Sequence, residues 1–202
     1  MKILIDREEK ELNIKDVSGF DELLANISQN NVSQGYVISQ IILNGKDISS
    51  YNLSDINVSD IERLELFTSS LKDIILDSLE NVYGYIGRLN EALKKVSELY
   101  RRGKAEEANN YYSECTEGLE WVLKTVHEIK SSIAQLGDKK IGAILVSDSE
   151  DMLIDILNKM FSAQKESDWI ILADLVEYKM IPLLQGWKDS ISGLKEELKG
   201  QV

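Results

Sequence analysis

The sequence predicts an α+β protein in two parts, a small domain of strands and one helix over residues 1–69 and a helical bundle over residues 70–202. The first observation is that apolar residues in residues 1–69 come in short runs separated by turn residues, which is typical of strands. The second is that from residue 70 on they recur every three or four positions, as they do on one face of a helix. The third is the length of 202 residues, which suits two domains.

The first part is expected to hold four strands and a short helix. The expected strands lie, in chain order, at residues 2–5, at the alternation of Leu12 and Ile14, at residues 36–43 and at residues 63–67. Residues 18–30 predict an amphipathic helix between the second and third strands, with Ser18 as its N-cap. Its apolar face would consist of Phe20, Leu23, Leu24 and Ile27.

This order of elements resembles the ubiquitin-like β-grasp fold: a hairpin, a helix across it, a strand that ends in Asn44-Gly45-Lys46, and a last strand after a turn-rich connection. The resemblance covers about the first 69 residues. Ubiquitin-type modifiers are conjugated through a flexible tail with two glycines, whereas here the last strand continues into TSSLKDII at residues 68–75. The resemblance therefore implies a fixed interaction domain and puts conjugation in doubt.

The second part is expected to be an up-and-down bundle of four helices joined by short links. The first helix begins at a cap at Ser69 or Ser70 and ends at residues 101–104, where basic residues and a glycine form a stop signal. The second follows over residues 105–136. The third begins after a cap at Ser147 or Ser149 and runs to about Phe161. Its inward residues would be Met152, Leu153, Ile156 and Met160. The fourth runs from Trp169 to about Leu198, and residues 141–146 fit either a helical turn or a buried strand.

Residues 99–129 resemble the helical hairpin of four-helix flagellar export chaperones, in which a glycine-containing turn precedes an acidic, alanine-bearing helix start. Here the turn is the Arg101-Arg102-Gly103-Lys104 stretch, and the helix start is AEEA at residues 105–108. This resemblance implies that the bundle binds an amphipathic helix or tail of a partner.

The charge distribution argues against several classes of partner. The net charge of −12 is divided about equally between residues 1–69 and 70–202, without a basic stripe. Nucleic acids and anionic membranes recruit clustered Lys and Arg, so neither is an expected partner. No apolar run approaches the roughly 20 residues that cross a bilayer. The opening residues MKILID do not have the pattern of a secretion signal, so we expect a cytoplasmic protein.

The usual catalytic and metal-binding patterns are missing from the sequence. One cysteine, Cys115, and one histidine, His127, exclude an internal disulfide and a zinc cluster with several Cys or His ligands. A di-iron site needs Glu-x-x-His pairs, and Lys124 occupies the position where the glutamate would stand. We expect a buried thiol at Cys115, a boundary or surface His127, and no catalytic residue, cofactor or metal. The alternative is an enzyme that uses acidic residues between the domains or a carboxylate metal site.

Three aromatic residues do not fit the inward stripes of the helices and are therefore candidates for partner binding: Tyr111, Trp121 and Tyr178. Partly exposed Tyr and Trp are enriched among the residues that contribute most to binding energy.

Asp174 and Glu177 are the remaining candidates for partner binding. They share a row of the last helix with both apolar and polar residues, about 100° from the buried stripe. We expect a partly hydrated face on which Lys179, or a basic side chain of another segment, offsets the two acids. Pro182, the only proline, is expected to bend this helix and to leave the carbonyl of Tyr178 without its backbone donor.

Together these observations predict a non-catalytic protein that binds another protein, as an adaptor or in a chaperone-like role. The partner segment would enter a groove between helices or pair with an exposed strand edge of the first domain. The sequence does not identify the partner, and it leaves a homodimer open.

Overall fold

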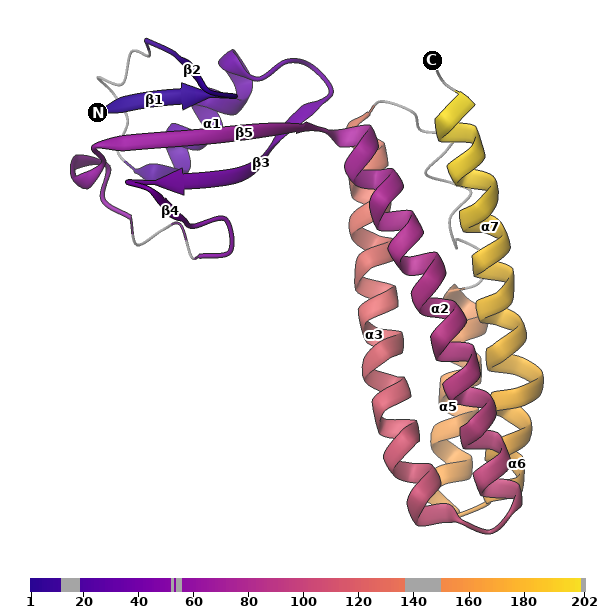
Figure 1. Cartoon of the computed structure of the whole chain (residues 1–202). Coiled ribbons are helices and arrows are strands. Elements are labelled where there is room, and N and C mark those ends of the chain that lie inside the picture. Colours follow the sequence, from indigo (N-terminus) through magenta and orange to yellow (C-terminus); the bar gives the residue numbers. More distant parts are fainter. Residues whose placement is uncertain (12–18, 52, 54–55, 137–149, 201–202) are drawn as a thin grey trace. The chain divides into compact units, whose positions relative to one another are not determined.

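The computed structural model describes residues 1–11, 19–51, 53, 56–136 and 150–200. It has the predicted α+β class: a mixed five-stranded sheet in the N-terminal part is followed by helices (Figure 1). Contacts within the chain divide it into two compact units, Met1–Ile74 and Ile75–Val202.

The sheet of the first unit has the strand order β2-β1-β5-β3-β4. Its strands are β1 (Lys2–Ile5), β2 (Glu8–Glu9), β3 (Tyr36–Leu43), β4 (Lys46–Asp47) and β5 (Arg63–Ser70). The two central neighbours β1 and β5 run parallel, and the other pairs are antiparallel. A short 3-10 turn, η2 (Val58–Asp60), precedes β5.

Two tight turns set the register of the hairpins. Asp6 and Arg7 join β1 to β2 with φ of 50° and 73°, and Asn44 and Gly45 join β3 to β4 with φ of 49° and 84°. Consecutive residues with positive φ match the right-handed twist of a hairpin, and Asn-Gly is the pair that adopts them most readily. The predicted turn at residues 44–46 is thus confirmed.

The second strand of the first hairpin is β2, at Glu8–Glu9. The two-residue turn at Asp6 and Arg7 reverses the chain at once, so pairing begins directly after it. The expected strand at Leu12 and Ile14 and the expected cap at Ser18 lie outside the described residues.

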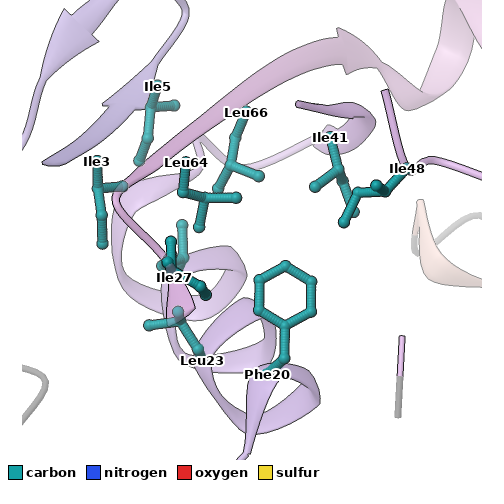
Figure 2. Packing of buried hydrophobic residues seen from close by; sticks show 10 residues of the cluster. Ile3, Ile5, Phe20, Leu23, Ile27, Ile41, Ile48, Leu64 and Leu66 are labelled. Carbon is teal, nitrogen blue, oxygen red and sulfur yellow. The ribbon is translucent and has the colours of Figure 1, made fainter. Parts of the chain in front are cut away.

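Helix α1 (Phe20–Asn31) packs against one face of this sheet (Figure 2). Phe20, Leu23 and Ile27 are its fully buried residues, as the periodicity predicts, whereas Leu24 is only partly buried. The sheet contributes alternate residues of its strands to the same core, which are Ile3, Ile5, Ile41, Leu64 and Leu66. Each large side chain buried in this way contributes about 1.5–3 kcal/mol to folding.

The second unit consists of helices that begin directly after β5. They are α2 (Leu71–Arg101), α3 (Ala105–Gln135), α5 (Glu150–Lys165), α6 (Trp169–Leu175), a π-helical turn η3 (Val176–Met180) and α7 (Ile181–Gly200). Gly103, with φ of 72°, forms the predicted stop between α2 and α3. Residues 141–146 and the expected caps at Ser147 and Ser149 lie outside the described residues. No helix in the described chain is sufficiently long and apolar to cross a membrane.

One prediction about the last helices is wrong. Met152 is not an inward residue, because 56% of it is exposed while Leu153, Ile156 and Met160 form the buried row. The segment that begins at Trp169 contains a wide turn, η3, directly before α7 and Pro182. The third helix also continues beyond Phe161, to Lys165.

Aromatic contacts connect the C-terminal end of α2 with the start of α6. The rings of Tyr100 and Trp169 stack at 5.4 Å with an interplanar angle of 1°, and the Tyr100 hydroxyl donates to Asn109 Oδ1 at 2.6 Å. Burial raises the pKa of Tyr100 to about 12. Trp187 of α7 is 2% exposed and belongs to the core of the unit.

Candidate functional site

The five predicted binding residues fall into two groups in the helical unit. Trp121 and Tyr111 lie along the surface that α2 and α3 share. Asp174, Glu177 and Tyr178 lie at α6 and η3, beside the end of α2. The sequence did not predict these two groups, because the positions of residues along separate helices do not indicate which helices are neighbours.

The first group surrounds a hollow of about 500 Å³, which we call the α2–α3 groove. It is lined by Asn81, Tyr85, Arg88, Glu114, Glu117, Gly118 and Trp121. Residues three and four positions apart share a face of a helix, so Tyr85 and Arg88 form one wall and Glu114, Glu117 and Trp121 the other.

Gly118 determines how closely Tyr85 approaches α3. A Cβ atom at position 118 would lie 2.5 Å from the Tyr85 hydroxyl oxygen and 3.2 Å from Tyr85 Cε1, both closer than side chains can pack comfortably. The missing side chain therefore makes room for the tyrosine ring. The sequence does not reveal this role of Gly118, because the role depends on a residue of another helix.

The groove combines aromatic rings with charges that form no ion pair among the described residues. The rings of Tyr85 and Trp121 lie 4.7 Å apart at 50°, and Arg88 Cζ lies 5.3 Å from the Tyr85 ring centre. Trp121 is 41% exposed, as predicted for an off-stripe residue. Arg88, Glu114 and Glu117 form no ion pair with any residue that the structure describes. Trp, Tyr and Arg are the residue types most enriched at binding hot spots.

Tyr111 is less available than predicted. It is partly buried, and Lys95 Nζ lies 3.6 Å from its ring centre. Lys95 follows Arg88 by two helical turns, so both lie on nearly the same face of α2. Tyr111 therefore continues the surface of the α2–α3 groove, but it is covered by a cation of its own chain.

Arg101 holds the second group together. Its Nη2 donates to Asp174 Oδ1 at 2.6 Å and to Glu177 Oε2 at 2.9 Å, and the Ser97 hydroxyl donates to the same Glu177 oxygen at 3.0 Å. The hydrogen bonds from Arg101 and Ser97 lower the pKa of Glu177 below its ordinary value. The basic side chain that was expected from another segment is thus Arg101, the last residue of α2, and not Lys179.

The two acids lie on a partly hydrated surface, as predicted. The side chains of Asp174 and Glu177 are 49% and 41% exposed, and Tyr178 is 61% exposed. Arg101 Cζ lies 5.7 Å from the Tyr178 ring centre, so one guanidinium contacts all three residues. Asp174 and Glu177 are already paired within the chain, which makes them less suited to bind a partner than the charges of the α2–α3 groove, which form no ion pair in the described chain.

A third surface was missed by sequence analysis. It is a hollow of about 370 Å³ between α5 and α6, the α5–α6 groove, lined by Asn158, Lys159, Ser162, Ala163, Glu166, Asp168, Ile171 and Leu175. Of the ten exposed large hydrophobic residues in the described chain, six lie between Met152 and Tyr178. The adjacent pair Ile170-Ile171 was the available signal, because two neighbouring residues of a helix point about 100° apart and rarely both face a core.

The single cysteine and histidine have the predicted environments. Cys115 is 5% exposed, and burial raises the pKa of its thiol to about 11, which favours the unreactive protonated form. His127 is exposed. Within the described residues there is no group of three or more His, Cys, Asp or Glu side chains that could hold a metal ion.

Two family models match the chain. One, described as Domain of unknown function (DUF8042), matches residues 77–190, and the other, described as TP0873 N-terminal domain, matches residues 1–70. No curated protein matches the chain, and no solved structure does.

Proposed function

We propose a non-catalytic, protein-binding role for this chain, which belongs to the family described as Domain of unknown function (DUF8042). In this proposal the chain acts in the cytoplasm as an adaptor or in a chaperone-like way, and its helical unit takes a segment of another protein. The matched family descriptions name no activity, so the proposal rests on the surfaces of the chain itself.

We also propose a fold for each of the two units. The first unit would be a ubiquitin-like β-grasp domain, which its strand order and the parallel pairing of β1 with β5 support. The second would be a four-helix bundle, in which α6, η3 and α7 together form the fourth helix. An exposed strand edge of the first unit is a second place where a partner could pair.

The observation that carries the proposal is the composition of the α2–α3 groove. An exposed tryptophan, a tyrosine and an arginine line one hollow, and the charged groups Arg88, Glu114 and Glu117 have no ion-pair partner in the described chain. A partner segment could place a basic side chain near the two glutamates and an acidic one near Arg88. Aromatic side chains in such a hollow offer large contact area at a low cost in conformational entropy.

The alternative, an enzyme with a carboxylate site, would use Asp174 and Glu177. A single arginine already forms ion pairs with both acids, and hydrogen bonds hold Glu177 in its charged form. A general acid at neutral pH needs the opposite, a carboxyl group with a raised pKa. This geometry favours the binding role.

The test begins by capturing a partner at the groove. Glu117 is replaced by a photo-crosslinking amino acid in the full chain, a cytosolic extract is irradiated, and the crosslinked protein is identified by mass spectrometry. The affinity of the purified partner is then measured by calorimetry for the wild type and for Trp121→Ala. We expect Trp121→Ala to weaken binding roughly 30-fold, the factor that corresponds to a hot spot of about 2 kcal/mol.

Tyr178→Ala is the matched control, because it removes another exposed aromatic residue at the other predicted site. It should leave the affinity within about twofold. Loss of binding in Tyr178→Ala with full binding in Trp121→Ala would show that the groove is not the site. A stoichiometric metal ion or a bound small molecule that Asp174→Asn with Glu177→Gln releases would favour the enzyme.

A further inference from the structure

The α5–α6 groove has an apolar wall on its α6 side and a mixed wall on its α5 side. Ile171 is 51% exposed and Leu175 is partly buried on the α6 side, while Ala163 lies on the α5 side. Met152, which is 56% exposed, lies two helical turns before Lys159 and therefore on nearly the same face of α5. Exposed aliphatic residues gathered in one place, and not scattered singly, are typical of a binding surface.

Acidic groups lie at the end of the groove where α5 turns into α6. Glu166 forms no ion pair with any residue that the structure describes. Asp168 accepts a hydrogen bond from the Ile171 N–H at 3.0 Å as the N-cap of α6, and it too has no ion pair in the described chain. The cation on the opposite wall is neutralised, because Lys159 Nζ lies 2.6 Å from Asp155 Oδ2. The groove thus has one apolar wall, on α6, and is negatively charged at one end.

We propose that the α5–α6 groove binds an amphipathic helix of a partner protein, whose apolar face covers Ile171 and Leu175 and whose basic residues pair with Glu166 and Asp168. This site consists of other residues than the α2–α3 groove. Binding at one groove can therefore be tested independently of binding at the other. The length agrees with such an occupant, because the stretch of α5 from Met152 to Lys165 extends for about 20 Å, which is nearly four turns of a helix.

The negative charge of this surface favours a basic partner helix over a second copy of the chain. Residues 150–178 contain seven carboxylates and two lysines, and the whole chain has a net charge of −12. Two copies of this surface would bring the unpaired acids Glu166 and Asp168 close to those of the other copy, which is unfavourable. A basic helix removes the same repulsion and contributes attraction, which also steers its approach.

The test measures the binding of a synthetic peptide to the full chain by fluorescence anisotropy. The probe is a labelled peptide of about 16 residues, with leucine on one helical face and lysine beside it, which can form about four turns. Its controls are a peptide in which glutamate replaces lysine and a scrambled basic peptide. We expect the basic amphipathic peptide to bind at least about tenfold more tightly than either control, and to weaken as salt is raised.

Adjacent isoleucines supply a matched pair of variants. Ile171→Ser should weaken binding about tenfold, whereas Ile170→Ser should change it less than about twofold, because Ile170 is 53% exposed but does not line the groove. Glu166→Gln with Asp168→Asn should weaken binding and flatten its salt dependence, and Asn keeps the N-cap of α6 intact. Trp121→Ala should bind like the wild type, which separates this site from the α2–α3 groove.

Three results would overturn the proposal. The first is equal binding of the basic and scrambled peptides, and the second is equal weakening by the two isoleucine variants. The third is self-association of the chain that Ile171→Ser abolishes, measured by sedimentation, because the groove would then be occupied by a second copy. Thermal unfolding of each variant, followed by circular dichroism, checks that the fold is retained, as the exposure of the substituted residues leads us to expect.

Discussion

Arg101 illustrates what single residues contribute to the helical unit. It ends α2, and its guanidinium contacts two carboxylates and an aromatic ring from α6 and η3. The sequence allowed the prediction that Asp174 and Glu177 need a basic partner, since both lie on a mixed row of one helix. It could not identify Arg101, which is 73 residues away from Asp174, because helical periodicity contains no information about contacts between helices.

The pairing of Glu177 predicts a pH-dependent contribution to stability. Its pKa is lowered in the folded chain from an ordinary 4.5, chiefly by the hydrogen bond from Arg101 and then by that from Ser97. A carboxyl group with a lowered folded pKa stabilises the fold above its unfolded pKa, and this contribution is lost as the pH falls through the folded pKa. We therefore expect Glu177→Gln to lower the free energy of unfolding at pH 7, and the difference from the wild type to shrink below about pH 4.5.

Urea unfolding at a series of pH values, followed by circular dichroism, measures this difference. Glu166→Gln is the control, because Glu166 forms no ion pair with the described residues and should show a much smaller change with pH. The free energy of unfolding of Glu177→Gln could instead stay below that of the wild type by a constant amount from pH 7 to pH 3. That result would mean that packing, and not charge, explains the effect of the substitution.

At the scale of elements, periodicity predicted the long helices well and their irregularities poorly. The apolar stripes and the glycine stop located α2 and α3, because burial of one face determines where such helices begin and end. The wide turn η3 was not predicted, since a π-turn changes the hydrogen-bond step over only five residues and leaves the apolar pattern almost unchanged. The close approach of α2 and α3 at Gly118 was missed for a related reason: a glycine in a helix has the same sequence pattern whether or not a neighbour fills its space.

The packing of Tyr85 against Gly118 can be measured with a double-mutant cycle. Replacing a glycine by alanine in an exposed helix raises the free energy of unfolding by up to about 1 kcal/mol. In Tyr85→Ala, where no ring occupies the space, Gly118→Ala should stabilise the chain by about that amount. In the wild type the gain should be smaller or reversed, because the new Cβ would lie 2.5 Å from the Tyr85 hydroxyl oxygen.

Urea unfolding of the four chains of the cycle gives the coupling energy between the two positions. Equal effects of Gly118→Ala with and without Tyr85 would show that the ring moves away at no cost. In that case the shape of the α2–α3 groove would not depend on the glycine.

At the scale of the whole molecule, the change of periodicity near residue 70 led to the prediction of two domains, residues 1–69 and 70–202. Contacts separate Met1–Ile74 from Ile75–Val202, the secondary structure changes from β5 to α2 at residues 70 and 71, and the two matched families cover residues 1–70 and 77–190. The change was visible in the sequence because strands and helices impose different repeats on the same kind of residue.

We expect residues 1–74 to fold alone with low stability. The cut lies beyond β5 because the Leu71 N–H donates to the Gly35 carbonyl at 2.8 Å and Leu71 is 8% exposed, so a cut at residue 70 would remove a contact of this unit. A domain of this size buries only about 60% of the surface of its unfolded chain, which makes its stability marginal. Dispersed amide signals in an NMR spectrum of residues 1–74 would support independent folding, and a collapsed spectrum would show that the unit needs the helices.

The positions of the three tryptophans have a practical consequence. Trp121, Trp169 and Trp187 all belong to the helical unit, and residues 1–74 contain no tryptophan. Light that excites only indole therefore reports on the helices and not on the sheet, whereas far-ultraviolet dichroism reports on both. Comparing the two signals during denaturation would show whether the units unfold together or in sequence, without any label. Because Trp121 is 41% exposed, Trp169 partly buried and Trp187 only 2% exposed, a soluble quencher would reach Trp121 most readily, so the chain contains its own optical probe of the α2–α3 groove.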